Sequence, residues 1–386
     1  MEKKLMQKRA VGVEGFACIA LMGTFFWYMT SRMGAINLIN TFMNTAHDLL
    51  LNTVFFIMGI AVLAGAFASI LSEFGVVAII NKILSPFMKP LYGLPGASAL
   101  GIVTTYLSDN PAVITLANDE GFKKYFKRYQ LPALTNLGTS FGMGLVVSAF
   151  MIAQSSVAGE SLILPTVIGN IGAFIGSIVS VNIMIRFTKK THMLPEEEEL
   201  FEKAAGKKEV EMREVREGSV SGRLLEASLE GGKSGVKLGL DIIPGVLIIC
   251  TLVMMLTNGA TNGEYTGAAY EGVGLLPFLG DKISFILRPL FGFKNSAALA
   301  FPITSLGAVG AAISLVPQLL KEGIIGRNEI AVFTAMGMCW SGYLSTHVAM
   351  MDSLRFRELT GKAIFSHTIG GIVAGVSANL LFSLLG

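Results

Sequence analysis

Charge is what this sequence has least of. Only 15% of its 386 residues are Asp, Glu, Lys or Arg, whereas a soluble domain carries about 25%. Hydrophobic residues make up 52% of the chain, and they recur in runs of about 20, the length that a helix needs to cross a bilayer. We therefore expect an all-α polytopic membrane protein whose first partner is the lipid bilayer.

Cysteine is also scarce, and its placement excludes a disulfide framework or a metal site. Cys18, Cys250 and Cys339 each lie inside an apolar run without ligand spacing. Phosphate-binding glycine loops, zinc-binding helices and nucleophile elbows are missing as well. Aromatic and basic residues do not interleave on a polar surface, so nucleic acid is not an expected partner. The sequence thus predicts neither an enzyme nor a cofactor, apart from a coupling ion such as Na⁺.

The chain contains one pattern twice. Pro90–Gly93 returns 199 residues later as Pro289–Gly292, and Thr105 returns at the same distance as Thr304. In an apolar chain, such a repeat is typical of transporters that are built from two related halves.

Seven apolar stretches are predicted as full spans, near residues 11–30, 50–72, 130–154, 162–186, 238–257, 329–351 and 363–385. Two further apolar segments, 94–118 and 294–320, contain helix-breaking residues. The first has an Asn-Pro turn signal at Asn110, and the second has Gly307 and Gly310. Each is either a bent span or a re-entrant hairpin that leaves the membrane on the side it entered.

The distribution of basic residues favours hairpins. Lys82 and Lys89 precede the first interrupted segment and a basic cluster at 123–128 follows it, so both flanks are expected in the cytoplasm, as is the N-terminus. The second interrupted segment then enters from outside, which makes the two halves inverted-topology repeats. Four basic residues fall outside in this arrangement and count against it: Lys282, Arg288, Lys321 and Arg327.

We predict four parts along the chain. Residues 1–49 form an N-terminal span and an outer loop, and residues 50–186 form the first repeat. Residues 187–237, with 10 Lys or Arg and 11 Asp or Glu, form a charged cytoplasmic linker before the second repeat, 238–386. In each repeat a span, an interfacial helix, the hairpin and two spans follow one another; the interfacial helices are 74–90 and 275–290.

The interruptions mark the predicted binding site, because non-helical backbone at membrane depth must be buried in protein or line a wet cavity. Asp109 is the strongest candidate, since a carboxylate within the membrane is costly and usually functional. It either couples transport to H⁺ or Na⁺, or it caps the helix that begins at Pro111. The predicted substrate- or ion-binding residues are Thr105, Ser108, Asp109, Asn110, Asn136, Thr139, Thr304, Ser305, Thr334, Ser341 and His347.

Several of these residues have a structural alternative. Ser and Thr side chains either line a solute path or bond to their own backbone. His347 is either a proton-linked group or a partner in a structural hydrogen bond. His367, Asn182 and Asn379 are expected to have structural roles.

The segment Tyr92–Leu100, followed by Asp109–Pro111, and the segment Phe291–Leu299 resemble the nucleoside-recognition (Gate) domain membrane proteins. That family includes spore-maturation A and B types and paired bacterial inner-membrane proteins, and this chain is similar to such a pair fused through 187–237. It is more distantly similar to the core of concentrative nucleoside transporters, whose hairpins and following helices enclose solute and Na⁺. The resemblance implies an elevator-like motion, a homo-oligomer and a place in the plasma (inner) membrane.

The leading hypothesis is a secondary active transporter of a small polar solute, such as a nucleoside, an amino acid or a peptide, driven by Na⁺ or H⁺. The alternative is a membrane assembly or signalling protein that retains the transporter frame without moving a solute. An intramembrane enzyme is disfavoured, because no Ser–His or paired-Asp constellation lies in two spans.

Overall fold

The structure is a computed structural model that describes residues 11–118, 120–123, 125–192, 215–261 and 263–386. Within these ranges the chain forms helices and loops without a β-strand. Six helical stretches in them are long and apolar enough to cross a membrane: Val13–Met33, Ala35–Glu73, Arg128–Ala158, Ile163–Lys189, Val220–Thr257 and Arg357–Leu385. The prediction of an all-helical, multi-pass membrane protein is confirmed.

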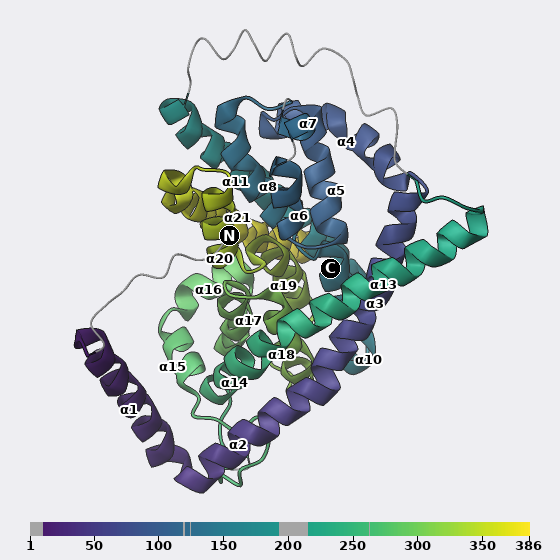
Figure 1. Ribbon diagram of the computed structural model, residues 1–386. Helices are drawn as coiled ribbons and strands as arrows, with labels where there is room; N and C mark the ends of the chain where they lie inside the picture. The colour runs from purple at the N-terminus through teal and green to yellow at the C-terminus, as the bar shows by residue number, and fades with distance from the viewer. Residues whose placement is uncertain (1–10, 119, 124, 193–214, 262) are drawn as a thin grey trace.

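After α1 (Val13–Met33) and α2 (Ala35–Asp48), one order of elements occurs twice. The first half contains α3 (Phe55–Glu73), α4 (Val76–Tyr92), α5 (Ala99–Leu107), α6 (Pro111–Asn118), α7 (Glu120–Lys123), α8 (Leu131–Thr139), α9 (Gly144–Ala153), α10 (Ser155–Ala158) and α11 (Ile163–His192). The second contains α13 (Val220–Pro244), α14 (Thr251–Thr257), α15 (Leu275–Lys282), α16 (Ser284–Phe291), α17 (Ala300–Ser305), α18 (Val309–Lys321), α19 (Arg327–Trp340), α20 (Tyr343–Ser353) and α21 (Thr360–Leu385). In Figure 1, α4 to α7 lie at the top of the molecule, whereas α14 to α18 lie in its lower part.

Matching hydrogen bonds occur at matching positions of the two halves. The Asn182 side chain on α11 donates through Nδ2 to the Leu91 carbonyl at 2.8 Å. Asn379 on α21 donates in the same way to the Leu290 carbonyl at 3.2 Å. Each bond ties the last long helix of a half to the end of its amphipathic helix, so the structural role predicted for these two asparagines is confirmed.

Two long helices begin earlier than predicted. The span expected at 50–72 is preceded by helical residues from Ala35, and the span expected at 238–257 begins at Val220. The outer loop predicted within residues 1–49 is thus helical over Ala35–Asp48, and the last part of the predicted linker 187–237 belongs to α13. Most of the remaining linker, including Glu196–Glu199, lies outside the described residues.

Tertiary contacts explain why the polar segment 35–48 is helical. Asn37 and Asn44 on α2 donate through Nδ2 to the carbonyls of Tyr265 and Gly267, at 2.9 and 2.8 Å. These bonds hold the loop 258–274 against α2. These asparagine side chains would also suit a solvated loop, but here they lie on a helix and bind the loop 258–274.

The helices α3 and α13 cross in close contact, as Figure 1 shows on the right of the molecule. The crossing depends on glycine, because a Cβ atom at Gly231 would collide with the backbone carbonyl of Gly65. At the neighbouring Gly232, a Cβ atom would lie 3.5 Å from Val62 Cγ1, which is ordinary contact. A π-helical turn directly precedes α3, at Leu49–Val54, and another directly follows α13, at Gly245–Cys250.

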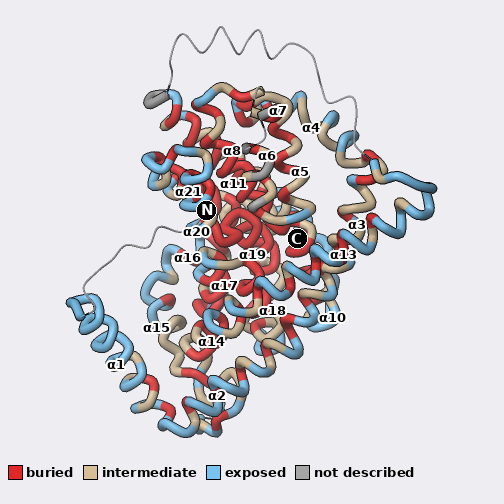
Figure 2. Tube along the Cα trace, viewed as in Figure 1, coloured by how far each residue is buried: buried red, intermediate tan, exposed pale blue. Residues whose placement is uncertain are grey.

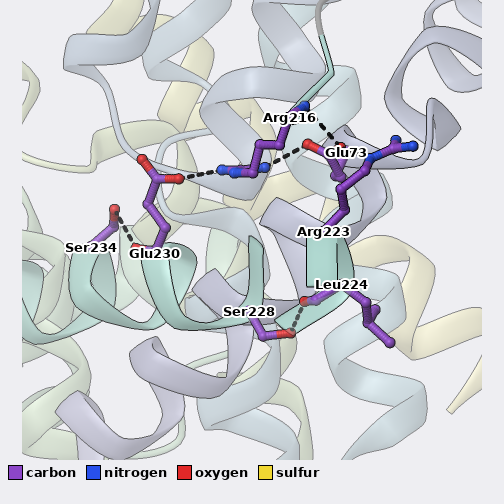
Figure 3. Close-up of polar contacts among 7 residues, drawn as sticks. All are labelled: Glu73, Arg216, Arg223, Leu224, Ser228, Glu230 and Ser234. Atoms are coloured by element: carbon purple, nitrogen blue, oxygen red, sulfur yellow. Dashed lines mark hydrogen bonds and ion pairs between the residues drawn. The ribbon is translucent and has the colours of Figure 1, made fainter. Parts of the chain in front are cut away.

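A buried carboxylate fastens one end of this helix pair. Glu73, at the end of α3, accepts hydrogen bonds from Arg216 Nη1 at 2.5 Å and from Arg223 Nε at 2.7 Å (Figure 3). Arg216 also pairs with Glu230, and the Arg223 guanidinium lies 5.4 Å from the centre of the Phe74 ring. These contacts attach the start of α13 to the end of α3.

The core lies where α11, α19 and α21 pack together, and buried residues concentrate there in Figure 2. The helix α1 stands apart from it and packs against α2. Phe16, Ile19 and Trp27 on α1 are 67%, 71% and 71% exposed, as expected of a helix that faces lipid.

Two predicted spans are interrupted. The span expected at 130–154 is divided between α8 and α9, and the span expected at 329–351 is divided between α19 and α20. Met143 and Gly342 have left-handed backbone angles, with φ of 56° and 69°, which end the preceding helical path. The predicted span 130–154 lies within the membrane-length stretch Arg128–Ala158, but it and the predicted span 329–351 each contain a break that the sequence analysis did not predict.

One carboxylate organises the loop 258–274. Glu271 is 1% exposed and accepts hydrogen bonds from the Thr266 amide at 3.0 Å, the Thr266 hydroxyl at 2.8 Å and the Gly267 amide at 2.9 Å. Burial raises the pKa of Glu271, but these donors together lower it more, so the pKa lies below its ordinary value.

The first prediction concerns the helix crossing. Gly231→Ala should destabilise the protein by about 1–3 kcal/mol, because the added methyl group forces α3 and α13 apart. Gly232→Ala should be neutral or stabilising by up to about 1 kcal/mol, because Ala favours helix more than Gly. Thermal unfolding in detergent compares the two, and equal effects would contradict the packing described.

The second prediction concerns pH. Because the pKa of Glu271 is lowered by folding, its carboxylate stabilises the protein above the ordinary pKa of about 4.3, and this contribution is lost as the pH falls through the folded value. Glu271→Gln should therefore lower the melting temperature at pH 7 and flatten its fall on acidification. Glu264→Gln, at an exposed position of the same loop, is the control and should follow the wild type. Parallel pH profiles for wild type and Glu271→Gln would refute this assignment.

Candidate functional site

Four helix interruptions meet inside the bundle. They lie at 108–110 between α5 and α6, at 140–143 between α8 and α9, at 306–308 between α17 and α18, and at 341–342 between α19 and α20. The first and third are the interruptions that the sequence predicts, whereas the other two divide helices predicted to be continuous. We call their meeting point the junction.

A hydrogen-bonded pair from the two halves closes the junction. Asn110, which is 2% exposed, donates through Nδ2 to the Ser341 carbonyl at 2.5 Å and to Ser341 Oγ at 3.1 Å. Gly142 lies against this pair, because a Cβ atom there would collide with Asn110 Oδ1. The interruption at 108–110 therefore touches the interruptions at 140–143 and 341–342.

The end of α17 and the interruption at 306–308 reach the same point through their backbone. The amide of Gly342 donates to the Ser305 carbonyl at 3.0 Å. A Cβ atom on Gly342 would lie 2.9 Å from the Gly307 carbonyl oxygen. The interruption at 341–342 is thus in contact with those at 108–110 and 306–308, and it joins three predicted residues, Asn110, Ser305 and Ser341.

The other predicted hydroxyl groups are used within their own helices. Each hydroxyl donates to a backbone carbonyl three or four residues earlier. Four of these bonds are 2.7 Å long: Thr105 to Gly101, Thr139 to Thr135, Thr304 to Ala300 and Thr334 to Ile330. The bond from Ser305 to Pro302 is 2.9 Å long. All five side chains are buried. These hydroxyl groups therefore match the structural alternative, because each donates its proton to a backbone carbonyl of its own helix.

Asp109 lies beside the junction. Its Oδ1 accepts from the Asn110 amide at 2.6 Å, so the carboxylate bonds to the backbone at the start of α6. The side chain is half-buried, and the neighbouring Ser108 is exposed. Asp109 also lies near enough to Asp241 on α13 for the two carboxylates to repel each other. A capping role and an ion-binding role are compatible with this position.

A second polar cluster is fully buried between α8, α11, α20 and α21. It consists of Asn136, Ser180, His347, Ser366 and His367, and we call it the histidine network. Asn136 Oδ1 lies 3.3 Å from His347 Nε2, and Asn136 Nδ2 lies 2.9 Å from Ser180 Oγ and 2.8 Å from Ser366 Oγ. Two predicted residues from different halves, Asn136 and His347, are thus brought together.

Sequence reasoning missed four residues that the structure brings to these clusters. Gly142, Ser180 and Ser366 had no signal beyond their place in apolar helices, because their contacts depend on packing between distant segments. Asp241 did carry a signal, since it is a carboxylate within the predicted span 238–257 and the rule that selected Asp109 applies to it equally.

The structure also has a cavity of about 430 Å³ at the outer end of the second half. Asn258, Tyr270, Gln318 and Glu322 contribute to its lining, together with part of the loop 258–274. It contains none of the predicted site residues. Within the described part of the chain, no group of three or more His, Cys, Asp or Glu side chains is placed to hold a metal ion.

Comparison with protein families gives a match to the nucleoside-recognition family, Gate, over residues 54–156. This region includes α5, α6, α8 and α9, and with them the two interruptions that the first half contributes to the junction. The resemblance predicted from the segments around Tyr92 and Asp109 is confirmed.

Solved structures of a concentrative nucleoside transporter, CNTnw, have a similar fold. The inward-facing, substrate-bound state gives a TM-score of 0.52 at 13% identity, with 96% of this chain and 87% of CNTnw covered. A CNTnw variant in the intermediate 2 state gives 0.46 at 12% identity, with the same coverage. At this identity the likeness concerns the fold. Among curated proteins, no sequence matches the chain.

The third prediction tests the junction. Gly142→Ala should displace Asn110 from Ser341 and destabilise the protein by about 1–3 kcal/mol. Gly307→Ala is the control, because a Cβ atom there would lie 3.6 Å from the nearest atom, the Thr304 carbonyl oxygen, and should change stability by less than about 0.5 kcal/mol. Thermal unfolding in lipid nanodiscs measures both. A Gly142→Ala variant as stable as Gly307→Ala would contradict the close contact at the junction.

Proposed function

We propose that the protein is a secondary active transporter of a small polar solute and that the solute binds at the junction. The observation that carries this proposal is the contact of both hairpin tips with a broken helix, through the Asn110–Ser341 pair and the Gly342–Ser305 bond. The transport occurs without chemical conversion of the solute.

The chemistry of the junction suits a solute with both donors and acceptors. Four helices end at the interruptions and four begin there, so carbonyl oxygens and amide hydrogens converge on one place. These groups carry partial negative and positive charge, respectively. A nucleoside has matching groups on its base and ribose, and the Gate match makes it the first choice, before amino acids and peptides.

The two halves offer unequal groups to such a solute. At the 199-residue offset, Asp109 and Asn110 correspond to Ala308 and Val309. The first hairpin therefore supplies a carboxylate and an amide where the second supplies backbone alone. This difference fits a site for an asymmetric solute, with Asp109 binding Na⁺ or H⁺.

We further propose that the halves are inverted repeats with re-entrant hairpins. Within the first hairpin, Gly101 lies against Val113 across the interruption, as in a chain that turns back on itself. Basic residues on both flanks of that hairpin support the same topology, as do the positions of α4 to α7 and of α14 to α18 in opposite parts of Figure 1. The N-terminus is then cytoplasmic in a plasma (inner) membrane protein.

An elevator-type motion would use the crossed pair α3 and α13 as its fixed part. The π-helical turn of the second long helix contacts the second hairpin, where Cys250 Sγ lies 2.9 Å from the Ala311 carbonyl. Movement of the hairpins and broken helices along this contact would expose the junction to either side. Solute and ion drive the motion only if they bind the two states with different affinities. The apolar outer face of α1 suits lipid or a second copy in a homo-oligomer.

One observation favours the alternative, a membrane assembly or signalling protein that moves nothing. The junction is closed by direct bonds between Asn110 and Ser341, so a solute must separate these residues in order to bind. In a transporter this closure belongs to one state of the cycle, whereas in an assembly protein it would be permanent.

The fourth prediction separates these functions. Proteoliposomes are tested for uptake of labelled nucleosides, amino acids and dipeptides, with and without gradients of Na⁺ and H⁺. Asp109→Asn should reduce ion-driven accumulation by about 5- to 150-fold, the usual size of a coupling between two ligands. Asp352→Asn, at an exposed position of α20, should accumulate solute like the wild type.

Full ion-driven accumulation by Asp109→Asn would remove this carboxylate from the mechanism. A wild-type protein that takes up no member of the panel under any gradient would refute transport of these solutes and favour the assembly protein.

A further inference from the structure

The histidine network contains two backbone carbonyls that can only accept hydrogen bonds. One is the carbonyl of Cys339, which lies 2.5 Å from His367 Nε2. The other is the carbonyl of Tyr343, which lies 3.0 Å from His347 Nδ1. Because these acceptors stand at the two ends of a continuous chain of hydrogen bonds, they determine which atom must donate at each step between them.

The chain can be followed from the Cys339 end. His367 Nε2 carries the proton, because its partner is a carbonyl. In a neutral imidazole the other nitrogen then has a lone pair, so His367 Nδ1 accepts from the Ser180 hydroxyl at 2.9 Å. Because the Ser180 hydroxyl donates its only proton to His367, Ser180 Oγ can only accept a hydrogen bond from Asn136.

Ser366 fixes the orientation of Asn136 in the same way. Its hydroxyl donates to the Ala363 carbonyl at 3.0 Å, so Ser366 Oγ also accepts from Asn136. The Asn136 amide nitrogen must therefore face Ser180 and Ser366, at 2.9 and 2.8 Å. Its carbonyl oxygen, Oδ1, faces His347. Thr135 Oγ1 also lies 3.3 Å from this oxygen, but its proton has a closer acceptor in the Pro132 carbonyl at 2.7 Å.

His347 consequently has an acceptor on both sides. Nδ1 faces the Tyr343 carbonyl at 3.0 Å, and Nε2 faces Asn136 Oδ1 at 3.3 Å. A neutral imidazole has one N–H and satisfies one of these acceptors, whereas an imidazolium has two and satisfies both. In its neutral form His347 therefore leaves one of these two nitrogen–oxygen contacts without a proton.

We propose that His347 is the proton-binding site through which this transporter is coupled to H⁺, an inference that rests on the proposed function. One proton from water adds to the free lone pair of the His347 imidazole, and no other bond is made or broken covalently. The imidazolium then donates to both Tyr343 O and Asn136 Oδ1. Release returns the same proton to water on the other side of the membrane.

The surroundings limit the site to one proton. The ring of His367 lies 4.7 Å from that of His347, so two imidazolium ions would repel each other. The Tyr343 ring packs against both imidazoles, and its hydroxyl bonds to Thr368. The nearby Cys339 thiol is directed to the Ala173 carbonyl, at 3.6 Å from Sγ. In the part of the chain that the structure describes, no carboxylate, Lys or Arg bonds to the network, and the described side chains of α6, which also packs on α20, are apolar.

Two opposing effects therefore act on the charged form. Burial without a counter-ion disfavours it, and two hydrogen bonds to the cation favour it. A site balanced in this way binds a proton in one conformation and releases it in another that admits water.

The proton site is linked to the junction through Tyr343. This residue begins α20, directly after the interruption at 341–342 that holds Asn110. Protonation of His347 ensures a bond to the Tyr343 carbonyl, which a neutral ring with its proton on Nε2 lacks. The geometry of the interruption, and with it the affinity for solute, thus depends on the proton.

The test of the proton site requires no solute. The chain has four histidines, His47, His192, His347 and His367, so the ring nitrogens can be followed by NMR after labelling with ¹⁵N-histidine in lipid nanodiscs. His347→Gln and His367→Gln assign the signals of the two buried rings. Between about pH 8 and pH 5, His347 should change from one protonated nitrogen to two, whereas His367 should keep its proton on Nε2 alone.

Three spectra would overturn the proposal: a His347 that stays neutral over this range, a His347 that stays doubly protonated over it, or a His367 that takes up the proton instead.

A second measurement links the site to transport. Exchange of labelled uridine across proteoliposome membranes should change several-fold between pH 5.5 and pH 7.5, and His347→Gln should abolish this dependence. His47→Gln, at an exposed position, is the control and should keep it. An equal pH dependence in His347→Gln would overturn the coupling role.

Wild-type vesicles that exchange no nucleoside, amino acid or dipeptide would refute the proposed function, whereas a His347 that does not titrate would refute the proton site alone.

Discussion

A helix that stops inside a membrane leaves amide and carbonyl groups that lipid cannot satisfy, and this constraint organises the protein. Four interruptions are placed where they satisfy one another, with Asn110 bonded to Ser341 and the Gly342 amide bonded to Ser305. The long crossed helices α3 and α13 pack beside this arrangement, and the charged groups at Glu73 hold their ends together. The most polar part of the membrane region is therefore also the part in which the two halves meet.

Much of this architecture could be predicted from local signals. The 199-residue repeat anticipates the same order of elements in both halves, and the Asn-Pro and glycine signals locate the interruptions at 108–110 and 306–308. The residues Asn110 and Ser341 were predicted from such signals, and the structure brings them into contact. A carboxylate or amide within an apolar run is informative because burying it is costly.

Other features could not be predicted, because they depend on packing between distant segments. The interruptions at 140–143 and 341–342 lie in sequences that are apolar enough to be predicted as continuous helices. From its sequence, segment 35–48 was predicted to be a polar loop. The structure shows a helix whose asparagines bond the loop 258–274. The buried threonines were selected for their polarity, yet their hydroxyls bond their own helices, a choice that sequence does not distinguish. The contact between Asn136 and His347 likewise appears only when α8 and α20 are placed side by side.

The central claim is that two inverted halves meet at the junction, each with a hairpin from its own side of the membrane. It is tested most directly by labelling Lys123→Cys and Lys321→Cys in intact cells with a membrane-impermeant maleimide, in a chain whose exposed Cys18 has been replaced. The account predicts that position 321 is labelled from outside and that position 123 is labelled only after the membrane is permeabilised. Labelling of both positions from the same side would contradict it.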